Sequence, residues 1–295
     1  MRLLKIALCL LSISLLVTLS VACSQTTNPG TDTPANTEIP ASTDASTEQG
    51  IADASGNDSG SKVPKVTGKF SFFVTSLEAM QKLSGSKDGF GGDLGGLQGA
   101  DRICQLIAEG VGAGHKTWKA FLSATKGPDG KPVHAIERIG KGPWYDRNER
   151  LIANNIQDLL SERPKGDPQA VKDLPNEHGQ GQLQFGDNHD TLTGTNKEGK
   201  LASTDPSTTC QDWTSSVGPG SEDKVICGHS WPRSAARSGG GGPGGGARGG
   251  ENWMSDHKLR GCTPGVNLKQ DGRGTGNCVG CSGGYGGIYC FALTP

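Results

Sequence analysis

The chain has 295 residues, with 29 basic and 30 acidic side chains, 47 glycines and nine cysteines. Two of the basic residues precede position 24 and six of the acidic residues lie in residues 24–61, so residues 62–295 hold 27 basic and 24 acidic residues. A surplus of about three positive charges is too small to indicate a nucleic-acid-binding protein. The length allows one or two domains, and the cysteine content makes the redox compartment the first question.

The N-terminus has the pattern of an export signal. Residues 1–5 carry two positive charges, and residues 6–21 form an apolar run that ends at Ala22-Cys23. A small residue immediately before a cysteine is typical of a bacterial lipoprotein signal peptide. We therefore predict a signal peptide over residues 1–22 and lipidation of Cys23. The alternative is an ordinary signal peptide cleaved near Ala22.

Residues 23–66 are predicted to be a disordered acidic tether. Residues 24–61 contain no Lys, Arg or aromatic residue and are rich in Thr, Ser, Ala and Pro. Such a composition buries too little apolar surface to offset the entropy of ordering. A folded domain over residues 67–295 follows. The expected location is the cell envelope, with a lipid anchor in the outer membrane and the domain at the cell surface.

Export would place the cysteines where disulfides persist. Without Cys9 in the signal and Cys23 as the lipid site, seven remain: Cys104, Cys210, Cys227, Cys262, Cys278, Cys281 and Cys290. Seven is an odd number, so one of them is free or Cys23 is not lipidated. The residues alone do not choose between these alternatives.

In chain order, residues 69–75 alternate and are rich in aromatics, which predicts a strand. The glycine-rich residues 89–97 predict a tight loop leading into a helix. Apolar residues then recur on one helical face over residues 100–111, and this face includes Cys104. Asp101 is expected in the first turn of that helix, and residues 118–123 predict a half-buried strand.

The later elements are less regular. Residues 142–145 predict an extended piece, and residues 151–160 predict either a second short helix or a strand and turn. Residues 161–190 have the composition of a long loop, and residues 238–250 form a glycine-rich loop. Residues 192–195 and 210–214 are interpreted as two strands.

The order of these pieces resembles endostatin, the C-terminal fragment of certain collagens, and resembles still more the bacterial endostatin-like lipoproteins, which include surface adhesins of spirochaetes. The resemblance covers about residues 70–293. The matching segments are Gly99-Ala100-Asp101-Arg102-Ile103-Cys104, Trp118-Lys119-Ala120-Phe121-Leu122-Ser123, Leu151-Ile152-Ala153-Asn154, Leu192-Thr193-Gly194-Thr195, Cys210-Gln211-Asp212-Trp213 and Ile288-Tyr289-Cys290-Phe291.

The resemblance implies an α+β, C-type-lectin-like domain with two helices, small antiparallel sheets, long loops and disulfide staples. It implies a bridge from Cys104 to Cys290 and a second bridge from Cys210. The family pattern favours Cys281 as the partner of Cys210. Cys262 is the alternative, because the segment around it also matches a family position.

Short motifs in the chain are compatible with redox chemistry and with metal binding. The Cys278/Cys281 pair has the spacing of redox or zinc motifs, but it lies in a glycine-rich context without a helix start. Further zinc ligands could come from Cys227 and Cys262, or a site could form from His189-Asp190 near Glu177-His178. We interpret these residues as structural disulfides and a solvated loop, and predict no metal ligand, no cofactor and no catalytic residue.

Calcium-dependent sugar binding in lectin-like domains uses a Glu-Pro-Asn or Gln-Pro-Asp triplet and a Trp-Asn-Asp. The chain offers only Leu174-Pro175-Asn176 and has no Trp-Asn-Asp. Arginines and aromatics beside the glycine-rich loop suit protein or polyanion binding. The predicted ligand-binding residues are Trp231, Arg233, Arg237, Arg248 and Trp253.

The function expected from the resemblance is that of a non-catalytic surface lipoprotein that binds extracellular matrix-type protein or glycan, with no nucleic acid as partner. The first alternative is a metal-dependent carbohydrate-binding lectin. The second is an envelope thiol-disulfide enzyme that uses Cys278 and Cys281.

Overall fold

A computed structural model describes residues 66, 68–217, 224–233, 252–269 and 276–294, all of which fall in one unit, Ser59–Pro295. Cys23, the predicted signal peptide and nearly all of the predicted tether lie outside the described residues. The strands are β1 (Phe72–Val74), β2 (Trp118–Ala120), β3 (Trp144–Tyr145), β4 (Leu151–Ala153), β5 (Asp190–Leu192), β6 (Val225–His229), β7 (His257–Leu259) and β8 (Gly284–Ala292). The helices are α1 (Leu77–Ser84), α2 (Gly96–Gly110), α3 (Ala135–Arg138), α4 (Ile156–Leu159), α5 (Pro168–Lys172) and α6 (Cys210–Trp213), with 3-10 turns η1 (Leu183–Phe185) and η2 (Pro206–Thr209).

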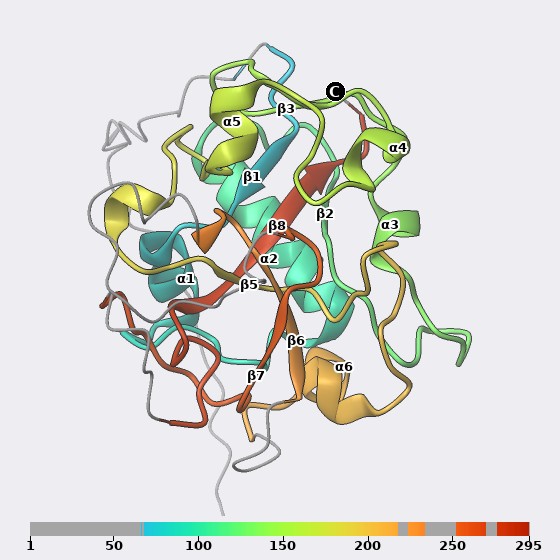
Figure 1. The fold of residues 1–295 in the computed structure, drawn as a ribbon, viewed down its shortest axis with the longest axis vertical. Helices are drawn as coiled ribbons and strands as arrows, with labels where there is room; N and C mark the ends of the chain where they lie inside the picture. Colours follow the sequence, from blue (N-terminus) through green and yellow to red (C-terminus); the bar gives the residue numbers. More distant parts are fainter. Residues whose placement is uncertain (1–65, 67, 218–223, 234–251, 270–275, 295) are drawn as a thin grey trace, which may run out of the picture. The chain divides into compact units, whose positions relative to one another are not determined.

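The domain is organised around β8, the last strand (Figure 1). The main sheet has six strands in the order β1-β8-β5-β6-β7, and β2 also pairs with β8. The pairings of β8 with β1 and β2 are antiparallel, whereas its pairing with β5 is parallel. A separate two-stranded sheet joins β3 and β4. The fold is therefore mixed α+β with small sheets, as predicted, but the main sheet is not purely antiparallel.

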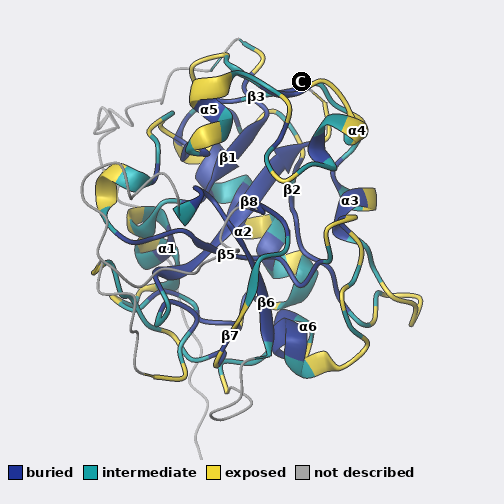
Figure 2. Cartoon of the chain, viewed as in Figure 1, coloured by how far each residue is buried: buried dark blue, intermediate teal, exposed yellow. Residues whose placement is uncertain are grey.

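Alternation along β8 supplies two cores, one on each face of the sheet. Ile288 and Cys290 belong to the core that α2 covers, and Tyr289 and Phe291 belong to the core on the opposite face. All nine residues of β8 are buried, as Figure 2 shows for the whole strand. A strand buried on both faces explains why its sequence lacks the polar alternation of a surface strand.

Helix α2 forms where the apolar periodicity predicts it. Ala100, Ile103, Cys104 and Ile107 are buried on one face, and the helix ends at Gly110. The helix begins earlier than expected, at Gly96, so the placement of Asp101 in the first turn is wrong. The Asp101 carboxylate instead accepts two hydrogen bonds from Arg138, at 2.8 and 2.9 Å.

Residues 151–160 hold both the strand β4 and the short helix α4, so each of the two predicted possibilities is correct in part. The predicted strand at 210–214 is wrong, because Cys210 to Trp213 run through a left-handed turn with φ between 50° and 66°. Such a run is unfavourable for residues with a Cβ, by about 1–2 kcal/mol each. The surrounding contacts must therefore hold it in place.

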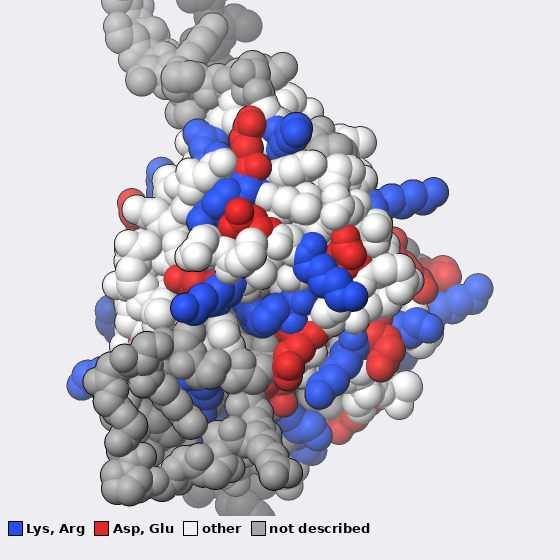
Figure 3. Space-filling model, turned by 45° about the horizontal axis from the view of Figure 1, so that its top comes forward, with Lys and Arg blue, Asp and Glu red and all other residues white. Residues whose placement is uncertain are grey.

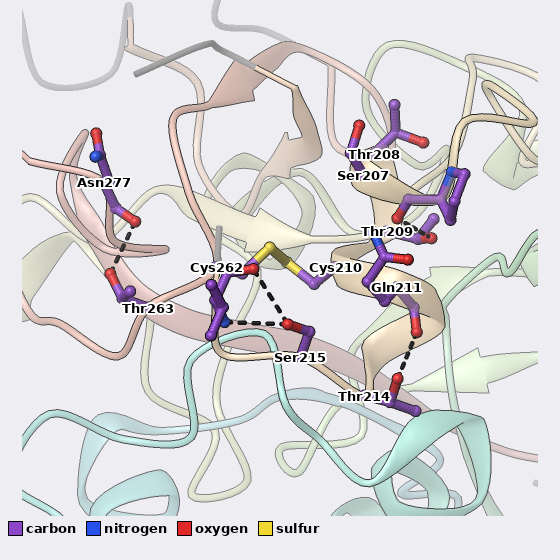
Figure 4. Close-up of a disulfide and its surroundings, with 12 residues drawn as sticks. Ser207, Thr208, Thr209, Cys210, Gln211, Thr214, Ser215, Cys262, Thr263 and Asn277 are labelled. Carbon is purple, nitrogen blue, oxygen red and sulfur yellow. Dashed lines mark hydrogen bonds between the residues drawn. A yellow bond between two sulfur atoms is a disulfide. The ribbon is translucent and has the colours of Figure 1, made fainter. Parts of the chain in front are cut away.

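The Asp212 carboxylate holds this turn. It accepts hydrogen bonds from the backbone nitrogens of Thr125 and Lys126 and from the hydroxyls of Thr125 and Thr209. The Cys210–Cys262 disulfide holds the first residue of the turn, at the start of α6 (Figure 4).

We expect Asp212→Ala to lower the free energy of unfolding by about 2–3 kcal/mol, because hydrogen bonds to a charged acceptor are lost and the turn remains strained. Chemical denaturation measures this change. Asp129→Ala, at a carboxylate whose side chain is 63% exposed, is the control and should stay close to wild type. Equal stability of the two variants would show that Asp212 does not hold the turn.

Candidate metal centre

Six potential metal ligands from three neighbouring strands and their flanks meet at one place. The donor cluster consists of His189, Asp190, Cys227, His229, Asp256 and His257. Strand register brings them together, because Asp190 of β5 pairs with His229 of β6, and Cys227 of β6 pairs with His257 of β7. Within β6, Cys227 and His229 are two residues apart, so their side chains share a face.

The distances between donor atoms match those around a metal ion. Asp190 Oδ1 lies 3.2 Å from His189 Nε2, 3.4 Å from His229 Nε2 and 3.5 Å from His257 Nε2. With metal–nitrogen bonds of about 2.0 Å in a tetrahedron, neighbouring nitrogen or oxygen ligands lie roughly 3.3 Å apart. The donor atoms are thus spaced for a shared ion.

The Cys227 thiol fits the same arrangement. Its Sγ lies 3.6 Å from His257 Nδ1 and 3.9 Å from Asp190 Oδ1. A tetrahedral ion with sulfur and nitrogen ligands separates them by roughly 3.6 Å. Cys227 is buried and free, whereas six other cysteines form three disulfides. Metal ligation would account for a buried cysteine that forms no disulfide.

His189 is oriented as a metal ligand usually is. Its Nδ1 lies 2.5 Å from Asp187 Oδ1, which leaves Nε2 directed to the cluster. A carboxylate behind a histidine is the common second-shell arrangement at zinc sites. Gly283 packs against the same ring, and a Cβ at that position would lie 2.6 Å from His189 Cε1. The ring is therefore held from two sides.

Several polar atoms of the cluster lack a hydrogen-bond partner. They are His189 Nε2, Asp190 Oδ2 and His229 Nδ1, all buried. Buried polar groups are normally satisfied, and each exception calls for an explanation such as an ion or a water. A metal ion between Asp190 and the histidines would satisfy His189 Nε2 directly.

Without a metal ion, burial and the neighbouring charged groups have opposite effects on the pKa values of the cluster residues. Burial opposes ionisation of Asp190, but His189 and His257 outweigh it and lower the Asp190 pKa to about 2. Burial raises the pKa of the Cys227 thiol to about 11, and burial lowers the pKa of His229. The pKa of His257 is raised: burial acts to lower it, but the neighbouring Cys227 and Asp190 have the larger combined effect. A bound dication would become the largest local charge and would favour thiolate and neutral imidazole.

The donor set indicates the kind of metal. Imidazole, thiolate and carboxylate together suit zinc, whereas calcium and magnesium take oxygen ligands. Four of the donors, His189, Asp190, Cys227 and His229, have side chains that are at most 2% exposed. Only His257, with 33% of its side chain exposed, offers the ion an edge toward solvent.

The structure gives a mixed result for the cysteines named in the sequence analysis. Cys104 and Cys290 are bonded, as expected, at a Cα–Cα distance of 5.5 Å. Cys210 is bonded to Cys262, so the preferred partner Cys281 is wrong and the alternative is correct. Cys281 instead pairs with Cys278, three residues away in the same turn. Their proximity in the chain makes that closure the easiest one available to Cys281.

Of the five predicted ligand-binding residues, the structure describes Trp231, Arg233 and Trp253. Trp231 and Trp253 are at most 1% exposed, so neither ring is available to a ligand at the surface. The Trp253 indole nitrogen donates to the Leu159 carbonyl, and large apolar rings of this kind gain most by entering the core. Arg233 is half-buried, and Arg237 and Arg248 lie outside the described residues.

No metal ligand is expected from the sequence, in which His189-Asp190 and Cys227 stand far apart. A usable signal was present in Cys227-Gly228-His229, where alternate residues of one strand offer two ligands to one face. The other donors become neighbours only through the pairing of β5 with β6 and of β6 with β7.

No known family model matches the chain, and a search of curated proteins finds no match either. Within the described part of the chain, no helix is long and apolar enough to span a membrane. On the face drawn in Figure 3, Lys and Arg are interspersed with Asp and Glu among the described residues. The donor cluster is therefore the strongest indication of function.

Proposed function

We propose that this domain binds one zinc ion in the donor cluster, with ligands drawn from His189, Asp190, Cys227, His229 and His257. The observation that carries the proposal is the convergence of their donor atoms, with His257 offering Nε2, at separations of 3.2 to 3.9 Å. The buried His189 Nε2, which lacks a hydrogen-bond partner, and the free cysteine also support it. Asp256 lies beside His229 and His257 and would assist at the rim.

We propose a structural role for this ion. The ligands come from the β5, β6 and β7 region, which includes the last two strands of the main sheet, so the ion would tie that end of the sheet together. The nearly complete burial of four donors leaves a substrate little access, whereas catalytic zinc sites keep an open position. Structural zinc adds its binding free energy to folding.

Metal analysis of the purified protein tests the proposal. After dialysis against zinc and then against metal-free buffer, we expect about one zinc ion per chain by inductively coupled plasma mass spectrometry. Variants His229→Ala and Asp190→Ala should each lose most of that zinc, whereas His178→Ala, at a histidine outside the cluster, should retain it. Zinc-free wild-type protein, or equal zinc in all four proteins, would contradict the proposal.

We further propose that the α+β domain belongs to the C-type-lectin-like, endostatin-like architecture. Support comes from the pairing of β1, near the start of the domain, with β8 at its end. Further support comes from the disulfide that joins α2 to β8, which is the bridge that the resemblance implies. An experimental structure that superimposes on endostatin over β1, α2 and β8 is the expected result, and a different strand order would contradict this assignment.

As the biological role, we propose a lipid-anchored surface protein that binds extracellular matrix-type protein or glycan without catalysis. Three disulfides are typical of a protein that folds outside the cytoplasm, which supports export. Protease treatment of intact cells, followed by pull-down with the released domain, tests surface exposure and binding together. Protection from protease in intact cells would contradict the surface location.

A further inference from the structure

A cavity of about 300 Å³, whose lining includes no residue of the donor cluster, lies between the start of α1, residues 176–188 and the beginning of β8. Five of its twelve lining residues are amides: Gln81, Asn176, Gln180, Gln182 and Asn188. We call it the amide cavity. Neither Lys nor Arg lines it, whereas Glu78 does, and His178 is its one histidine. The cavity therefore offers mainly neutral donors and acceptors.

A chain of hydrogen bonds fixes the orientation of the buried amides. The Trp231 indole N–H, which can only donate, bonds to Asn188 Oδ1 at 2.9 Å. Asn188 must then direct its Nδ2 to Gln182, whose Oε1 accepts at 3.0 Å. This hydrogen bond fixes the Gln182 amide, with Oε1 directed to Asn188 and Nε2 directed away from it.

Gln182 Nε2 is thereby left without a hydrogen-bond partner, although the side chain is only 1% exposed. The Tyr285 hydroxyl is not an acceptor for Gln182 Nε2. It donates to the Thr75 carbonyl at 2.6 Å and faces Gln182 Oε1, the other end of the amide. Leaving an amide donor buried and unpaired is unfavourable, so the floor of the cavity calls for a hydrogen-bond acceptor.

The rim of the cavity adds an apolar platform. Phe185 is 44% exposed, while the other described phenylalanine, tyrosine and tryptophan rings are mostly in the core. Leu77 and Leu268 lie on the same lining and are only partly buried. A ligand is thus offered polar groups below and an aromatic face at the mouth, the combination that orients small ligands in their sites.

Hydrogen bonds from backbone nitrogens to side-chain oxygens hold the cavity walls in place. Asp173 Oδ1 accepts from the Gln182 and Leu183 nitrogens, and Asn176 Oδ1 accepts from the His178 and Gln180 nitrogens. The site is therefore preorganised, which reduces the entropic cost of binding.

We propose that the amide cavity binds a neutral saccharide residue, with a ring hydroxyl accepting from Gln182 Nε2 and an apolar sugar face against Phe185. A hydroxyl can accept the hydrogen bond that Gln182 Nε2 lacks and can also donate one to an amide oxygen of the lining. The absence of Lys and Arg among the lining residues and the presence of Glu78 disfavour an anionic sugar. No metal ion takes part, and the inference does not depend on zinc in the donor cluster.

Saturation-transfer NMR with the purified zinc-treated protein tests this inference, using glucose, galactose, mannose and N-acetylglucosamine as probes. We expect transfer from the protein to at least one of these sugars. Phe185→Ala and Gln182→Met should each weaken binding of that sugar by roughly tenfold, since a stacking contact or a hydrogen bond is lost. Val217→Ala, at another exposed apolar position outside the cavity lining, should bind as wild type does.

No transfer to any of the four sugars would overturn the inference, as would binding that Phe185→Ala and Gln182→Met leave unchanged. A high-resolution structure in saturating sugar with only a water on Gln182 Nε2 would also overturn it. The zinc content of the same samples separates the two proposals. Stoichiometric zinc without sugar binding removes only the saccharide, and sugar binding without zinc removes only the metal.

Discussion

Replacing His229 with alanine is expected to make the thermal stability of the domain insensitive to zinc. In the wild-type protein, zinc at about a thousand times its dissociation constant should add about 4 kcal/mol to the free energy of unfolding. His229 faces Asp190 across the β5–β6 pair and lies 3.0 Å from His257, so its loss removes a ligand from the centre of the cluster. Removing one ligand also leaves Asp190 buried with fewer partners.

The measurement is calorimetric unfolding of wild type and His229→Ala, each with zinc and with a chelator. Wild type should unfold at a clearly lower temperature in chelator, and His229→Ala should unfold at the same low temperature in both. His178→Ala serves as the matched control and should respond to zinc as wild type does. If wild type is equally stable with zinc and with chelator, the ion has no structural role.

The second large effect belongs to the Cys104–Cys290 disulfide. It closes a loop with a sequence separation of 186 residues, so the chain-entropy relation gives a stabilisation of roughly 5 kcal/mol. The Cys278–Cys281 bridge has a separation of three, for which the same relation gives roughly 2 kcal/mol. Alanine at Cys104 and Cys290 keeps most of the packing, because both thiols are small and fully buried.

Denaturant titration of the two double variants compares these effects directly. Cys104→Ala/Cys290→Ala should be destabilised by more than twice as much as Cys278→Ala/Cys281→Ala. A larger loss for the Cys278–Cys281 variant would contradict the entropic account and would point to a specific role of that turn.

The sequence predicted the parts of the fold that local patterns determine. The buried face of α2 follows from a 3.6-residue period that needs no knowledge of the rest of the chain. The Cys104–Cys290 bridge, by contrast, came from the resemblance and not from periodicity. The preference for Cys281 as partner of Cys210 failed, because spacing near the C-terminus does not reveal that Cys278 competes within the same turn.

Two features had no local signal. Cys210-Gln211-Asp212-Trp213 contains no glycine to mark a left-handed turn, and that turn depends on Asp212 contacting residues 125 and 126, more than 80 positions away. The donor cluster depends likewise on register, since Asp190 and His257 are separated by 67 positions and meet only through β6. Contacts formed by sheet pairing cannot be read from spacing along the chain.

The most direct test of the zinc site is X-ray absorption at the zinc edge of the purified protein. The account predicts one sulfur at about 2.3 Å and two to four nitrogen or oxygen ligands at about 2.0 Å. The sulfur shell should disappear in Cys227→Ser while the nitrogen and oxygen shell remains. A wild-type spectrum with nitrogen and oxygen ligands alone would exclude Cys227 as a ligand, and a spectrum of hydrated zinc would contradict the site as a whole.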